Sequence, residues 1–250
     1  ETPPAAPATA RLAHLREWTR FSVHGWRDVE VAAPQGPAPA DGLERLGIGP
    51  LLYRALRDRG DSRAAHFEAA YRGAAGQNLA TLARVARARD LLQALGIVPV
   101  LIKGGAFLLR HSPGDLGVRA MADFDLLVGP EPFDEAFAAL SEAGWRRASP
   151  ELQFSSRVAP AVTLVTKDAG GVAVQIDLHR HLAQWPLLKE MPARVVAGAE
   201  APGGWHLPSL LHAALEVGNC LHAGDGYRSL VVNAFNVVKI LGRVGCTGKR

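Results

Sequence analysis

The stretch "RAMADFDLLVGP", residues 119–130, places two aspartates two positions apart in an otherwise apolar run. In a strand, the side chains of residues i and i+2 point to the same face, so Asp123 and Asp125 should project together. Two carboxylates this close repel each other unless a cation lies between them. Oxygen ligands without interleaved Cys or His favour a hard ion such as Mg²⁺. The stretch therefore predicts a strand that carries part of a metal site; a strand-end or helix-cap role for one of the acids is the alternative.

A second strand pattern repeats this arrangement downstream. In "VAVQIDLH", residues 172–179, alternation places Gln175, Asp177 and His179 on one face. Three acids on two neighbouring strands can hold two metal ions for in-line displacement at phosphorus. We expect His179 to support Asp177 or to contact phosphate, since a zinc site here lacks a third nitrogen or sulfur ligand.

A glycine pair upstream supplies a candidate phosphate site. In "LIKGGAFL", residues 101–108, a short strand-like run ends and a helix begins around Gly104 and Gly105. Glycines there permit close approach of a ligand to the backbone, and free N–H groups at a helix N-terminus attract anions. Lys103 and Arg119 would add positive charge for a triphosphate. A plain tight turn with a solvated lysine is the alternative.

The segments around these motifs differ in pattern. Residues 1–10 predict a disordered lead-in, and residues 11–95 predict an N-terminal helical region because their apolar residues recur at helical spacing. Residues 96–180 predict the order β-α-β-α-β-β, with "KDAGG" as a hairpin turn between the last two strands. Residues 181–250 begin with an irregular segment and end in two predicted helices, which form a C-terminal helical region.

Composition narrows the classes of protein. The chain is 48% hydrophobic and 21% charged, which is typical of a globular protein. The net charge is +4, but the arginines of the N-terminal region are scattered through helical patterns. This predicts a solvated helix face and argues against a nucleic-acid partner.

The sequence contains neither a membrane-spanning apolar run nor a signal pattern, so we expect a cytoplasmic protein without a membrane partner. Cys220 and Cys246 fit neither a zinc spacing nor a disulfide framework and predict free thiols.

The order of motifs in the sequence is a strand, K-G-G, a helix, R-x-M-x-D-x-D-L-L-V, a second helix and a later D-L-H. This order resembles that of the DNA polymerase β-like nucleotidyltransferase superfamily. It is most similar to a branch of largely uncharacterised bacterial nucleotidyltransferases, several of which occur beside peptide or natural-product biosynthesis genes. The specific part of the resemblance covers residues 101–130 and 174–180. The resemblance implies an α+β fold with an α/β-type nucleotidyltransferase core, in which helices flank a small mixed β-sheet and helical regions precede and follow it.

The resemblance also implies roles for individual residues. Phosphate binding falls on Gly104 and Gly105, and divalent metal binding on Asp123, Asp125 and Asp177. The implied activity is Mg²⁺- or Mn²⁺-dependent transfer of an NMP from an NTP, with ATP expected, to a small-molecule or peptide acceptor, with release of pyrophosphate. Lys103 and Arg119 match positions common in the branch, and His179 belongs to the D-L-H motif.

One position departs from the branch. Its members usually have an acid in the last helix, where this sequence has Asn236 in "NAFNVVKI". The departure leaves the handling of the acceptor open, and the sequence identifies no general base.

Two other functions fit parts of the pattern. A glycosyltransferase can use D-x-D to hold Mn²⁺ and a nucleotide-sugar, but the Gly-Gly helix start and Asp177 argue against it. A non-catalytic module that binds a nucleotide or a peptide has no reason to keep three mutually repelling carboxylates. The sequence therefore favours the nucleotidyltransferase.

Overall fold

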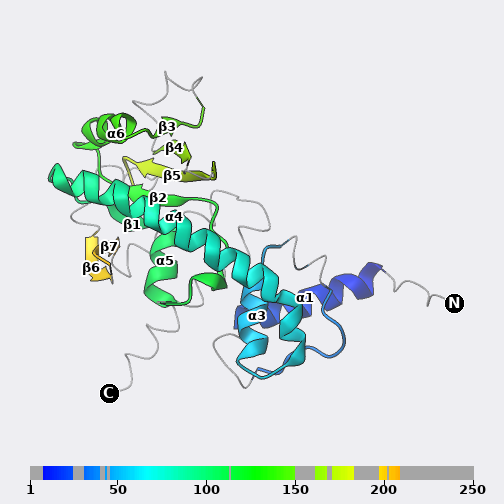
Figure 1. Cartoon of the computed structure of the whole chain (residues 1–250). Coiled ribbons are helices and arrows are strands. Elements are labelled where there is room, and N and C mark those ends of the chain that lie inside the picture. The colour runs from blue at the N-terminus through cyan, green and yellow to red at the C-terminus, as the bar shows by residue number, and fades with distance from the viewer. Residues whose placement is uncertain are drawn as a thin grey trace, which may run out of the picture. The chain divides into compact units, whose positions relative to one another are not determined.

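Figure 1 shows the computed structural model of the chain, which describes residues 8–24, 31–39, 43, 46–112, 114–149, 161–167, 171–182, 197–201 and 203–208. The chain divides into two compact units. One comprises residues 1–76, 117–120 and 224–250, and the other residues 77–116 and 121–223. The predicted C-terminal helices, Cys220, Cys246 and Asn236 lie outside the described residues. Within these described ranges, no helix is both long enough and apolar enough to cross a membrane.

The described part of the first unit is helical. It contains α1 (Ala8–His24), α3 (Gly49–Arg57), the 3₁₀ helix η1 (Ser62–Phe67) and the first turns of α4 (Glu68–Ala94). Since α1 begins at Ala8, residues 8–10 of the predicted disordered lead-in are helical. Pro50 lies in the first turn of α3, where its missing N–H has no helical acceptor to lose. The helices bury an apolar core whose largest fully buried members are Trp18, Leu43, Ile48, Leu52, Leu56 and Phe67.

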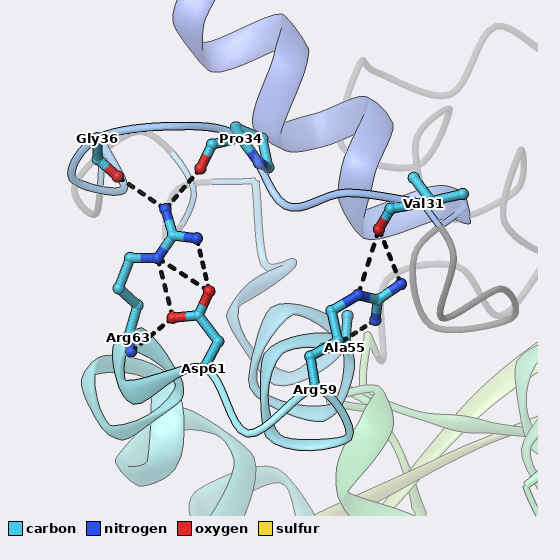
Figure 2. A network of polar contacts seen from close by, with 7 residues as sticks. All are labelled: Val31, Pro34, Gly36, Ala55, Arg59, Asp61 and Arg63. Carbon is cyan, nitrogen blue, oxygen red and sulfur yellow. Dashed lines mark hydrogen bonds and ion pairs between the residues drawn. The ribbon is translucent and has the colours of Figure 1, made fainter.

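Two arginines fasten the proline-containing segment 31–39 to this unit, as Figure 2 shows. Arg63 donates to the carbonyls of Pro34 at 2.6 Å and Gly36 at 2.8 Å, and Asp61 holds the same guanidinium from the other side. Arg59 donates to the carbonyl of Val31 through two nitrogens, at 3.2 and 3.1 Å. The predicted solvated helix face is therefore wrong for these two arginines. Their guanidinium groups satisfy backbone carbonyls that a non-helical segment would otherwise leave without partners.

The described part of the second unit is built on one mixed sheet of seven strands. They are β1 (Val100–Ile102), β2 (Phe124–Leu127), β3 (Arg146–Arg147), β4 (Ala161–Lys167), β5 (Ala173–His179), β6 (Ala197–Ala201) and β7 (Trp205–Pro208), in the order β3-β4-β5-β2-β1-β7-β6. β1 and β2 are antiparallel, whereas β2 and β5 are parallel. β4 and β5 pair antiparallel as the predicted hairpin. The mixed α+β fold with a small mixed sheet is confirmed.

Helix α5 (Lys103–His111) lies between β1 and β2 in the chain, and helix α6 (Phe133–Glu142) lies between β2 and the edge strand β3. α6 buries Phe133, Ala136 and Leu140, which recur at the three- and four-residue spacing of a helix face. All four residues of β2 are buried. A strand buried along its whole length is covered on both faces. Asp125 of β2 is therefore buried together with its apolar neighbours.

The hairpin of β6 and β7 adds two strands that the sequence did not indicate, in a segment expected to be irregular. β7 pairs parallel with β1, with Val100 opposite His206. Arg89 of α4 donates to the carbonyl of Gly203, and its guanidinium lies over the ring of Trp205 at 4.5 Å from the centroid. The side chain of Arg89 is only 11% exposed, so this arginine is also not part of a solvated face. Its contacts join α4 to the hairpin.

Candidate active site

The site is built where β2 and β5 run side by side. Their parallel register makes Asp125 the partner of Asp177, and Leu127 the partner of His179. Paired residues on adjacent strands point to the same face of the sheet, so the two carboxylates are neighbours and His179 follows one step further along that face. The predicted third acid on a neighbouring strand is therefore confirmed in its position beside Asp125.

Three side chains bring possible metal ligands together. Asp125, Asp177 and His179 each offer one ligand atom, and these atoms lie within 4.8 Å of one another. Oδ1 of Asp177 is buried, and no hydrogen-bond partner for it exists among the described residues. A buried acceptor of this kind normally has a partner, and a cation would supply one. Two carboxylates on adjacent strands thus suit Mg²⁺ or Mn²⁺, the hard ions expected from the sequence.

Lys103 points into this group from the start of α5. Its Nζ lies 2.5 Å from Oδ1 of Asp125 and 3.3 Å from Nε2 of His179. The Asp125 side chain is 6% exposed and the Lys103 side chain 34% exposed, so the ion pair has a buried acid and a partly solvated base. The acid cluster, which consists of Asp125 and Asp177, is therefore already in contact with one positive charge from the chain itself.

Asp125 is ionised in this environment. Burial favours its neutral form, but the hydrogen bond from His179 and the charge of Lys103 outweigh burial and hold the pKa of the Asp125 carboxyl below its ordinary value. Nε2 of His179 lies 2.8 Å from Oδ1 of the same carboxylate. Since a carboxylate only accepts, we assign the proton to Nε2 of His179, which donates. With that proton in place, His179 orients Asp125 and does not use Nε2 as a metal ligand. The sequence had suggested Asp177 as its partner.

Asp123 and Arg119 are not among the three grouped ligands. Asp123 is half-buried and lies one residue before β2, and the ligand group found among the described residues does not include it. Arg119 is half-buried and belongs to the segment 117–120, which is part of the first unit. The metal role of Asp123 and the phosphate role of Arg119 stay predictions.

The two glycines are both buried in the first turn of α5. A Cβ added to Gly105 would lie 2.7 Å from Cδ1 of Phe124 and 3.0 Å from Cδ1 of Leu101. Gly105 therefore allows α5 to pack closely on β1 and β2, which is a structural reason for this glycine that the sequence did not reveal. The residue that precedes the helix, Ile102, provides no side-chain cap. Phosphate binding at Gly104 and Gly105 stays a prediction.

Thr163 is a neighbour of the site that the sequence analysis did not single out. It is the cross-strand partner of Asp177 on β4 and is half-buried. The sequence did not reveal this pair, because counting back from the turn "KDAGG" aligns Asp177 with Ala161, whereas the observed register aligns it with Thr163. Its hydroxyl is thus available on the face that carries the carboxylates.

Comparison with known families gives one match. A family described as uncharacterised nucleotidyltransferase matches residues 41–228, which include every residue of the site. A comparison with curated proteins gave no match.

Proposed function

Because the chain belongs to the family of uncharacterised nucleotidyltransferases, we propose that it transfers an NMP from an NTP, in the first instance ATP, to a small-molecule or peptide acceptor. A hydroxyl, amine or phosphate oxygen of the acceptor attacks the α-phosphorus. The bond from the α-phosphorus to the bridging oxygen breaks, and pyrophosphate leaves. The observation that carries this proposal is the parallel register that pairs Asp125 with Asp177 beside the start of α5.

The proposal includes Mg²⁺ or Mn²⁺ as cofactor and membership of the DNA polymerase β-like superfamily. A divalent ion, when bound, neutralises the triphosphate and stabilises the attacking and leaving oxygens. Asp125 and Asp177 would hold it, with Asp123 as a third ligand. His179 orients Asp125 through the hydrogen bond from Nε2.

The phosphates have a separate proposed binding site. The first turn of α5 follows β1 directly, and its N–H groups would bind phosphate oxygens. Gly104 lets the phosphates approach the backbone there. Arg119 would add charge to the triphosphate site.

Calorimetric binding of Mn·ATP tests the assignment. Asp177→Asn removes a proposed ligand with little change of shape, and Glu142→Gln neutralises an exposed acid at the end of α6 as the matched control. We expect the first variant to lose Mn·ATP binding and the second to bind as the unmodified protein does. Equal binding by both variants would show that Asp177 is not a ligand of the metal.

Activity is tested with each NTP and a cell extract, by mass spectrometry for the added nucleotide and by release of pyrophosphate. A UDP-sugar offered in parallel tests the glycosyltransferase alternative. That alternative requires the D-x-D pair, Asp123 and Asp125, to act together, whereas the ligand group in the described residues combines Asp125 with Asp177 and His179. No observation favours a second function.

A further inference from the structure

We propose that Lys103 is a built-in counter-ion of the acid cluster, which holds Asp125 in the absence of metal and competes with the divalent ion for it. This role rests on the proposed metal site. It differs from triphosphate binding, the role that the sequence suggested for Lys103. The direct observation is the 2.5 Å contact between Nζ of Lys103 and Oδ1 of Asp125.

The backbone at Lys103 is shaped for this contact. Ile102 is the cross-strand partner of Asp125, so Lys103 is the first residue beyond the pairing. Lys103 has φ of 49°, and among the described residues it is the one non-glycine residue with positive φ. Left-handed backbone is unfavourable for a side chain with a Cβ, and glycine would adopt it without strain. The strained residue is thus the one whose side chain reaches the buried carboxylate.

The charges explain why lysine and metal would compete. The Asp125 side chain is 6% exposed, so its charge needs a partner inside the protein. Lys103 is that partner, because its Nζ donates to Oδ1 of Asp125. The same oxygen also accepts from Nε2 of His179. A divalent ion bound between Asp125 and Asp177 would lie beside the ammonium group, and the two cations would repel each other. Metal binding therefore requires Lys103 to withdraw from Asp125.

This competition has a measurable size. Coupling between two binding events typically changes affinity by about 5-fold to about 150-fold. We expect Lys103→Met to bind Mn²⁺ alone more tightly than the unmodified protein by a factor in that range. Lys103→Arg keeps the positive charge and should retain the weaker binding. Lys167→Met removes the same charge at the exposed end of β4, four residues beyond the strand partner of Asp177, and should also retain the weaker binding.

The experiment measures Mn²⁺ binding by electron paramagnetic resonance without nucleotide, together with the melting temperature with and without Mn²⁺. Without metal, Lys103→Met should have a lower melting temperature than the unmodified protein. Mn²⁺ should raise the melting temperature of Lys103→Met by more than it raises that of the unmodified protein. Lys103→Gly relieves the left-handed strain and should show the same tighter binding, so it serves if the methionine variant does not fold.

Two results would overturn the proposal in distinguishable ways. If Mn²⁺ binds and Asp177→Asn abolishes binding, but Lys103→Met and Lys103→Gly match the unmodified protein, the role of Lys103 is wrong and the metal site stands. If Mn²⁺ does not bind to the unmodified protein or to the lysine variants, or if binding survives Asp177→Asn, the metal site is wrong and the role of Lys103 falls with it.

Discussion

Replacing Gly105 by alanine distinguishes a packing role from a phosphate role for this residue. The added Cβ would lie 2.7 Å from Phe124 and 3.0 Å from Leu101, closer than van der Waals contact allows. Overpacking costs about 1–3 kcal/mol of the free energy of unfolding, whereas alanine in place of glycine inside a helix returns up to about 1 kcal/mol. Gly73 in α4 has no atom within 4 Å of an added Cβ, so alanine there gains the helix term alone. We expect Gly105→Ala to lose about 1–2 kcal/mol and Gly73→Ala to gain about 0.5–1 kcal/mol.

Urea denaturation followed by circular dichroism measures both changes, and calorimetry with Mn·ATP measures binding by the same proteins. The packing explanation predicts that Gly105→Ala loses stability, and that any loss of nucleotide binding accompanies it because α5 is displaced. If Gly105→Ala were as stable as Gly73→Ala and lost nucleotide binding alone, the packing explanation would be refuted and a direct phosphate role supported.

Three further predictions concern the arginines and their partners. Arg63→Met should lose about 1–2 kcal/mol of unfolding free energy and increase proteolysis of the proline-containing segment, with exposed Arg16→Met as control. The hydrogen bond from Arg63 outweighs burial and lowers the pKa of Asp61 in the folded state. Ionised Asp61 therefore stabilises the fold at pH values above its unfolded-state pKa, and this stabilisation is lost as the pH falls through its folded-state pKa. Asp61→Asn should therefore be less stable near neutral pH, and the difference should vanish in acid titrations of the melting temperature. Arg89→Met should lose about 1–3 kcal/mol and alter tryptophan fluorescence, unlike exposed Arg87→Met.

The central strands were predictable because their patterns are local. β-branched residues and alternation indicated β1, β2, β4 and β5, and the turn "KDAGG" indicated that β4 and β5 form a hairpin. The shared face of Asp177 and His179 followed from a period of two residues. The sequence offered β5 as a candidate neighbour of β2, but the parallel register that pairs Asp125 with Asp177 could be seen only in the fold.

Other features depend on partners distant in the sequence. β6 contains only Ala, Gly and Glu, so its strand structure comes from pairing with β7 and not from its own preference. A pattern of charges cannot show whether an arginine meets water or a carbonyl, which is why Arg59, Arg63 and Arg89 were assigned to a solvated face. The left-handed backbone that directs Lys103 toward Asp125 likewise has no signature in the sequence, since lysine rarely adopts it.

The pairing of β1 with β7 has a consequence for synthesis of the chain. β1 and β2 lie close in sequence, but the other edge of β1 is covered by a strand more than a hundred positions later, with Val100 opposite His206. While the ribosome makes the intervening segment, the apolar strand Val100–Ile102 exposes unpaired N–H and C=O groups to other nascent chains. A chain that ends before residue 197 would leave that edge of β1 unpaired permanently. The same fragment would still contain Asp125, Asp177 and Lys103. Such a fragment should contain the acid cluster and still aggregate, so expression of the site requires the hairpin that closes the sheet.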